Sequence, residues 1–213
     1  MVGAMLGGVV ADKVGRKRGL LLSQAMGALG GVIMAVSRPV MAWEVLLVGR
    51  LVVGLCAGLN TVLVPTYVSE IAPVNLRGGL GVFNQLAVTL GIFLGQVLGL
   101  GQVLGNEDGW PWLLAVTIIP CVMQIILLLF SPMSPRYLAI TLNDTEEARE
   151  ALMVLRNGDV AMVEMELEEM RQEREAEKEP DLTILELLAS KKLRVSLVIC
   201  IVMHLSQQFC GIR

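Results

Sequence analysis

The sequence predicts an all-α protein, a polytopic bundle of membrane-spanning helices with one aqueous insert. Of its 213 residues, 54% are apolar and only 17% are charged, whereas a soluble domain has about 25% charged residues. The charge is also unevenly distributed, because residues 131–193 hold eight Lys/Arg and fifteen Asp/Glu. The rest of the chain is mildly basic and contains long uncharged runs. This combination is typical of an integral membrane protein.

The first charged cluster follows a short apolar run. Residues 1–11 supply only about half of the roughly 20 residues that a spanning helix needs, so we expect a partial helix at the start of a fragment. Asp12, Lys13 and residues 16–18 (Arg-Lys-Arg) then crowd into a short loop. Cationic side chains in such a loop mark the cytoplasmic side of a membrane, and Gly15 allows a tight turn.

Four complete spans are predicted after this loop. Residues 19–37, 78–106 and 109–135 carry no charge, and residues 45–69 carry only Arg50. In the first of these spans, two glycines four residues apart, at positions 27 and 31, allow close helix packing.

The loop charges set the topology. With the first loop inside, Arg38 and residues 107–108 lie outside, while Arg77 and the acidic insert lie inside. Each inner loop then carries Lys or Arg, as the positive-inside rule requires.

The insert, residues 131–193, is predicted to be a cytoplasmic helical segment. Asp144 can cap a helix that ends near Gly158, and residues 164–178 form a charge-rich helix with a solvated face. Thr183 begins a capping box for another short helix. Beyond the insert, the uncharged run over residues 195–212 predicts one more span.

The loop at residues 8–18 resembles the signature loop between the second and third helices of the major facilitator superfamily, with Lys13 and Lys17 in place of two arginines. Other stretches resemble the sugar porters, and among them the facilitative glucose transporters. In chain order these stretches are residues 49–54, 65–78, 84–96, 131–137 and 205–212. Six such motifs in the right order are far less frequent by chance than any single one.

This resemblance implies a partial major facilitator superfamily fold. Residues 1–130 would be transmembrane helices two (partial) to six, residues 131–193 the cytoplasmic linker domain, and residues 194–213 the start of helix seven. Helix one and the C-terminal half of the transporter would be missing. The resemblance also implies a multi-pass protein of the plasma membrane.

The resemblance further implies a hexose substrate. A neutral ring of hydroxyls is best bound by side-chain amides, which both donate and accept hydrogen bonds. The sugar-binding glutamines of the family correspond to Gln85, Gln207 and Gln208, although a Gln in a span also serves as a packing contact between helices. Val88 and Ile92 share a helical face with Gln85 and could line the apolar side of the pocket.

A cytoplasmic charge network is the second site that the resemblance implies. It would hold the two halves of the transporter together when the sugar site faces outward. Its members here are Asp12, Arg16, Lys17, Glu70, Arg77 and Arg136; for Lys17, contact with lipid headgroups is the alternative.

Three positions depart from the family pattern. Met133 replaces a glutamate of the charge network, and Arg213 replaces a sugar-binding asparagine. His204 replaces a glutamine of a motif associated with glucose-preferring members, so the choice between glucose and fructose is left open.

The sequence therefore predicts facilitative transport of a glucose-like hexose, with a proton-coupled sugar symporter and a non-transporting truncated product as alternatives. It contains no nucleophile–base pair, metal cluster or phosphate loop, so we predict neither an enzyme nor a metal or cofactor site. The four cysteines fit neither a zinc pattern nor a disulfide framework. The expected partners are the hexose, the lipid bilayer and the missing half of the transporter, with no nucleic acid.

Overall fold

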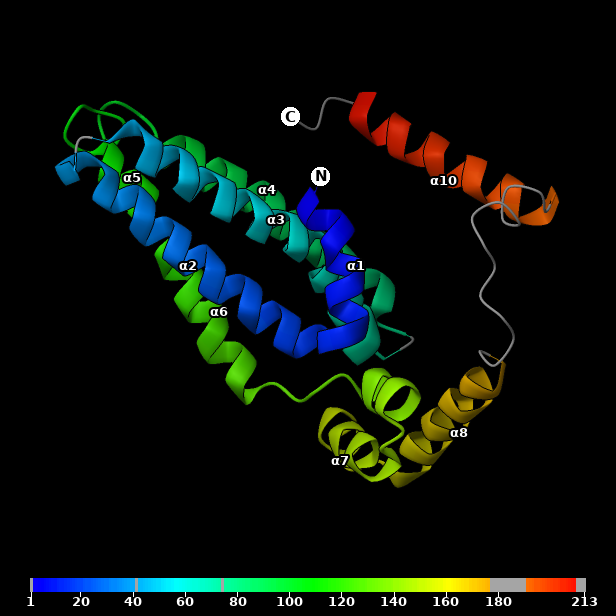
Figure 1. Cartoon of the computed structure of the whole chain (residues 1–213). Coiled ribbons are helices and arrows are strands. Elements are labelled where there is room, and N and C mark those ends of the chain that lie inside the picture. The colour runs from blue at the N-terminus through cyan, green and yellow to red at the C-terminus, as the bar shows by residue number, and fades with distance from the viewer. Residues whose placement is uncertain (1, 41, 74, 177–190, 210–213) are drawn as a thin grey trace. The chain divides into compact units, whose positions relative to one another are not determined.

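The computed structural model describes residues 2–40, 42–73, 75–176 and 191–209 (Figure 1). Every regular element among these residues is a helix, which confirms the predicted all-α class. The chain divides into two compact units, Met1–Arg171 and Gln172–Arg213, and each is described by itself below.

Helix α2 (Arg16–Val40) is the centre of the first unit. It packs against α1 (Val2–Val14) and α3 (Trp43–Ile71) on one side and against α5 (Trp110–Ala115) and α6 (Ile118–Phe130) on the other (Figure 1). Glycines make this close approach possible, as predicted. A Cβ atom on Gly31 would lie 2.8 Å from Ile118 Cγ1 of α6, so a larger residue there would push the two helices apart.

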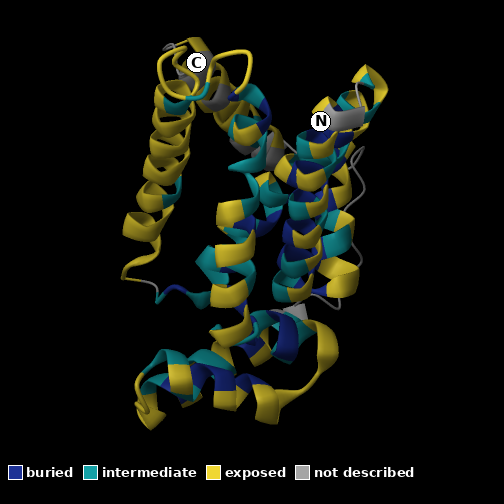
Figure 2. Cartoon of the chain, turned by 90° about the vertical axis from the view of Figure 1, so that its left-hand side faces the viewer, coloured by how far each residue is buried: buried dark blue, intermediate teal, exposed yellow. Residues whose placement is uncertain are grey.

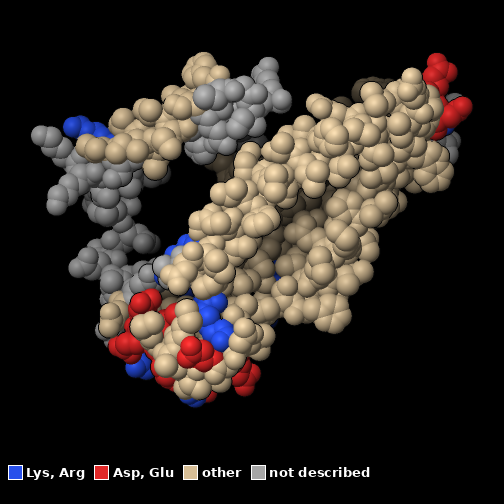
Figure 3. Space-filling view, turned by 180° about the vertical axis from the view of Figure 1, so that it is seen from behind, with Lys and Arg blue, Asp and Glu red and all other residues tan. Residues whose placement is uncertain are grey.

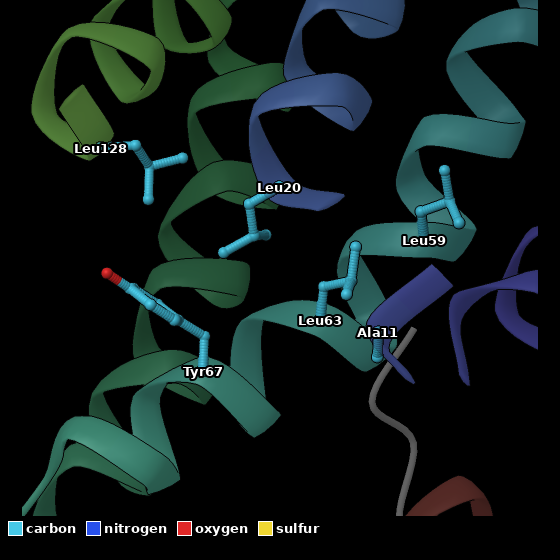
Figure 4. Packing of buried hydrophobic residues seen from close by; sticks show 6 residues of the cluster. All are labelled: Ala11, Leu20, Leu59, Leu63, Tyr67 and Leu128. Carbon is cyan, nitrogen blue, oxygen red and sulfur yellow. The ribbon is translucent and has the colours of Figure 1, made fainter. Parts of the chain in front are cut away.

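An apolar cluster closes the end of the bundle that adjoins the charged loop (Figure 4). Leu20 and Leu63 are almost fully buried at its centre, and Tyr67 points toward Leu128 of α6. The cluster consists of Ala11, Leu20, Leu59, Leu63, Tyr67 and Leu128. Because these side chains come from four helices, their burial fixes the positions of those helices beneath the loop.

Four helical segments in the described part of the chain are long and apolar enough to cross a membrane, which confirms the predicted number of complete spans. They are Arg16–Arg38, Trp43–Ile71, Arg77–Leu98 and Trp110–Phe130. They expose many large apolar side chains, with Phe130 85% exposed. Figure 2 shows exposed residues along these helices, and Figure 3 shows that their visible face is largely uncharged between its two ends. Charged side chains gather over the insert and at the opposite end of the helices (Figure 3). A lipid-facing surface has this distribution.

The third predicted span ends early, and the fourth is interrupted. The third span, α4 (Arg77–Leu98), ends at Leu98 rather than near residue 106, because glycines at positions 99 and 101 favour turns over helix. The fourth span consists of α5 (Trp110–Ala115) and α6 (Ile118–Phe130). Pro120 has no N–H to offer the Val116 carbonyl, and the Ile119 N–H bonds that carbonyl instead at 3.1 Å.

The insert begins with η1 (Tyr137–Leu142), a short π-helix, followed by α7 (Thr145–Leu155) and α8 (Val160–Ala176). The predicted cap is confirmed, because the Asp144 carboxylate accepts a hydrogen bond from the Glu147 N–H at 3.0 Å. The predicted stop is also confirmed, since Gly158 adopts a left-handed φ of 82° just beyond α7.

Helix α8 has a buried apolar face beside the solvated face that the charges predict. Val163 is fully buried and Met170 is nearly so, and both pack with Leu152 of α7. The charged residues around them hide this apolar stripe in the sequence. The predicted capping box at Thr183 lies outside the described residues. In the second unit, α10 (Lys191–Phe209) is helical where a further span was predicted.

Candidate functional site

The turn between α1 and α2 brings the predicted charges together. Gly15 adopts φ 89°, which favours glycine, and a Cβ there would lie 2.7 Å from Tyr137 Cε1. This glycine therefore lets the charged loop lie directly against the insert. Asp12 lies in the last turn of α1 and Arg16 begins α2, on either side of one tight turn.

Arg16 and Glu70 form the central ion pair of the site. Arg16 Nε lies 2.9 Å from Glu70 Oε1, and the two side chains are 17% and 9% exposed. Arg16 Nη1 also donates to the Ala11 carbonyl at 3.2 Å, and its guanidinium lies 5.4 Å from the centre of the Tyr137 ring. Asp12 contributes less, because its carboxylate is 3.9 Å from Arg16 and 76% exposed.

The second oxygen of Glu70 holds the segment that enters the insert. Ser134 Oγ donates to Glu70 Oε2 at 2.5 Å and accepts a bond from the Tyr137 N–H at 3.2 Å. Ser134 is 2% exposed. One carboxylate thus joins α2, α3 and the start of the insert, and a charge-assisted bond of this kind is roughly twice as strong as a neutral one.

Two further bonds fasten the same segment. Lys17 Nζ donates to the Ser131 carbonyl at 2.7 Å, and Tyr67 O–H donates to the Pro132 carbonyl at 2.7 Å. Lys17 therefore bonds to protein rather than facing only solvent. The sequence pattern assigns no role to Tyr67 or Ser134, because each acts through a partner more than sixty residues away.

Arg77 and Arg136 lie beside this cluster. They line a polar cavity of about 30 Å³, room for about two water molecules. The other residues around it are Glu70, Ala72, Arg156, Glu166, Glu169 and Met170. All six predicted charges thus lie at one end of the bundle.

Arg156 is a further charged residue that the sequence does not single out. Its Nε and Nη2 atoms bond Glu166 Oε1 and Oε2 at 2.7 and 3.0 Å, and its Nη1 donates to the Ile71 carbonyl at 3.1 Å. The Arg156 and Glu166 side chains are only 6% and 12% exposed. This arginine ties α8 to the C-terminal end of α3, one residue beyond Glu70.

Met133 occupies the position where the family pattern has an acid. In this chain it packs against the apolar cluster of Leu138, Ala148 and Ala151 in the insert. The thioether therefore adds apolar contact where the family pattern would add charge.

The predicted sugar residues of α4 share one open face. Gln85 is exposed, and Val88 and Ile92 are 50% and 44% exposed. Their spacing of three and seven residues places them on one side of the helix. Gln207 and Gln208 lie on α10 in the second unit, so their meeting with Gln85 stays a prediction. Arg213 lies outside the described residues.

Comparison with known proteins covers the whole chain. A family model described as "Sugar (and other) transporter" matches residues 1–213. Human solute carrier family 2, facilitated glucose transporter member 4 is 43% identical over 213 residues, which are 100% of this chain and 42% of that protein. Human member 5 is 42% identical over 212 residues, 99% of this chain and 42% of that protein. The chain thus spans less than half the length of these relatives.

Solved structures show the same helix arrangement. The xylose transporter XylE from E. coli, in a partially occluded inward-open conformation, matches with a TM-score of 0.72 and 26% identity over 80% of this chain and 44% of that chain. A structure of the proton:xylose symporter XylE bound to 6-bromo-6-deoxy-D-glucose matches with a TM-score of 0.73 and 25% identity. This match covers 82% of this chain and 41% of that chain. The predicted family and the predicted partial superfamily fold are confirmed.

Proposed function

Since this chain belongs to the sugar transporter family, we propose that it supplies part of a carrier that moves a glucose-like hexose across a membrane by alternating access. The observation that carries this proposal is the family match over residues 1–213. The similar proteins are named as glucose transporters, and one similar structure holds a glucose derivative. A carrier of this kind needs no chemical step, and we propose none.

We propose that Gln85, Gln207 and Gln208 bind the hydroxyls of the hexose. The exposed face of α4 supports this, because it presents an amide next to the apolar side chains of Val88 and Ile92. A pyranose ring has hydroxyls around its edge and C–H groups on its faces, so it is matched by that combination of side chains. An amide left without a partner would disfavour sugars that lack the matching hydroxyl.

We propose that the cluster around Glu70 is the inner gate of the carrier. The bonds of Glu70 to Arg16 and Ser134 support this, because they make the end of the bundle one connected unit. Arg77 and Arg136 beside the cavity would extend that unit toward the second half of the transporter. Breaking such contacts would let the two halves rock apart on the inside.

The division of the chain belongs to the same proposal. Residues 1–130 would be the first-half helices, residues 131–193 the cytoplasmic linker domain and residues 194–213 the start of helix seven. The bonds of Lys17, Tyr67 and Glu70 to residues 131–134 support a linker docked on the first half. We propose the plasma membrane as the location.

A proton-coupled symporter is the second candidate, because one similar structure is that of a proton:xylose symporter. The two functions differ in their response to a collapsed proton gradient. The product of the whole gene and the 213-residue chain alone should both be expressed in cells that lack hexose transporters. Uptake of radiolabelled 2-deoxyglucose should then be measured with and without a protonophore.

For a uniporter we expect uptake by the whole gene product that the protonophore leaves unchanged. Loss of uptake with the protonophore would establish symport instead. Absence of hexose uptake, with the protein present at the cell surface, would refute the sugar assignment. Uptake by the 213-residue chain alone would show that it needs no further helices.

The sugar site has a separate test in the whole gene product. Gln85→Leu removes the amide and keeps the size of the side chain, so we expect KM for 2-deoxyglucose to rise about 2- to 10-fold, the value of one hydrogen bond. Gln102→Leu is the control, because Gln102 is exposed in the turn after α4. Equal KM values for the two variants would remove Gln85 from the site.

A further inference from the structure

Two buried thiols meet inside the bundle, about four turns along α3 from Glu70. Cys56 of α3 and Cys121 of α6 are 5% and 6% exposed. A Cβ atom on Gly27 of α2 would lie 2.8 Å from Cys56 Sγ and 3.1 Å from Cys121 Sγ. Both sulfur atoms therefore crowd the same point beside Gly27 and lie close to each other.

The polar groups beside Cys56 make its sulfur atom a hydrogen-bond acceptor. Asn60 Nδ2 donates to Cys56 Sγ at 3.5 Å, and Ser23 Oγ donates to Asn60 Oδ1 at 2.6 Å. These two contacts connect the Cys56 sulfur to α2 through Asn60. The thiolate is the form that binds metals, and it forms here as the ion displaces the thiol proton.

We propose that Cys56 and Cys121 form a two-thiol site for a soft divalent cation that prefers linear two-coordinate geometry. Hg²⁺ is an example of such an ion. Thiolates select soft metals. Zn²⁺ is usually bound by four ligands. Among the residues that the structure describes, no group of three or more His, Cys, Asp or Glu is placed to hold a metal. Two neighbouring thiols supply the two ligands that such an ion needs.

The binding step balances without an oxidant. Two S–H bonds break and two Hg–S bonds form, while HgCl₂ releases two chlorides and two protons leave with them. The product carries no net charge, because two thiolates neutralise the divalent ion. It therefore avoids the large cost of burying a charge among apolar helices. The bound ion would join α3 to α6 across α2, independently of the proposed transport function.

The test uses the full 213-residue chain in membranes, with Cys200→Ser and Cys210→Ser in every variant so that only the proposed pair remains. The protein is loaded with HgCl₂, freed of excess reagent and challenged with increasing glutathione. Bound mercury is counted by mass spectrometry, and free thiols are counted after denaturation. We expect one Hg²⁺ per chain with both thiols protected.

Chelation by two thiols distinguishes a site from two separate cysteines. We expect release from the pair to need at least about tenfold more glutathione than release from the Cys56→Ser or Cys121→Ser variant, because the second bond forms within the molecule. Release at the same glutathione concentration in all three proteins, with equal helix content by circular dichroism, would overturn the proposal.

Gly27→Ala gives a second measurement that keeps both thiols. Its methyl group would occupy the point between the sulfurs, so we expect mercury to be released as easily as from the single-cysteine variants. Gly54→Ala is the matched control, because a Cβ on Gly54 of α3 meets no atom within 4 Å. Undiminished mercury retention in folded Gly27→Ala would contradict the proposed geometry.

Discussion

Glu70 is the residue on which the inner end of the bundle depends most. Its two oxygens accept from Arg16 Nε at 2.9 Å and from Ser134 Oγ at 2.5 Å, and its side chain is 9% exposed. Glu70→Gln turns one oxygen into a donor and leaves a donor without a partner. We expect the free energy of unfolding to fall by about 1–3 kcal/mol. At about 2–4 °C per kcal/mol for a chain of this size, Tm in detergent should fall by several degrees.

Asp12→Asn is the matched control for that change. Asp12 is also an acid near Arg16, but its carboxylate is 76% exposed and 3.9 Å away. An exposed pair of this kind contributes about 0–1 kcal/mol, so Tm should stay nearly constant. A larger fall for Asp12→Asn than for Glu70→Gln would refute the central place of Glu70.

Residues that act locally could be predicted from the sequence, whereas residues that act across the fold could not. Asp144 caps a helix three residues away, and that pattern is visible in sequence. The partners Arg16 and Glu70 are 54 positions apart, and only the family resemblance connected them. Ser134 lay inside a recognised motif, yet its bond to Glu70 needs the fold to bring α3 beneath the insert.

At the scale of elements, the α1–α2 turn depends on Gly15. Alanine at φ 89° costs about 1–2 kcal/mol in backbone strain, and its Cβ would lie 2.7 Å from the Tyr137 ring. We therefore expect Gly15→Ala to lower Tm and to loosen the insert from the bundle, which limited proteolysis of the insert would detect.

Gly8→Ala tests the same substitution within α1. A Cβ on Gly8 meets no atom within 4 Å, and alanine in a helix interior is favoured over glycine by about 0.5–1 kcal/mol. Tm should therefore hold or rise. If Gly15→Ala proved as harmless as Gly8→Ala, the turn would not require its left-handed glycine.

The α7–α8 hairpin offers a paired test of burial. Arg156→Ala leaves Glu166, 12% exposed, and the Ile71 carbonyl without their partner. Breaking a buried ion pair costs about 3–5 kcal/mol, so hydrogen exchange of α8 amides should speed up strongly.

Arg149→Ala also breaks a bond between α7 and α8, the 2.6 Å contact with Glu164, but those side chains are 46% and 55% exposed. We expect the loss of this ion pair to lower the stability of the hairpin by at most about 1 kcal/mol. Hydrogen exchange of the α8 amides should therefore change little. Similar exchange in the two variants would show that Arg156 does not fasten the hairpin.

At the scale of the whole molecule, hydropathy predicted the spans because a lipid-facing helix must be apolar along its length. It erred at the end of α4 and within the fourth span, where glycines and Pro120 decide the backbone while the hydropathy stays high. It also missed the buried stripe of Val163 and Met170, because charged residues are interspersed with the apolar residues of α8. Individual glycine and proline residues thus set where a helix ends, and packing between helices sets which face of a helix is buried.

Sugar counterflow in proteoliposomes tests the account most directly. The purified whole gene product is reconstituted, loaded with unlabelled glucose and diluted into a trace of labelled glucose, with no pH gradient or membrane potential. An alternating-access uniporter should accumulate label transiently above its outside concentration, because the unlabelled sugar returns the site to the outer face. If folded protein gave no transient accumulation of labelled glucose, the result would contradict facilitative hexose transport by this protein.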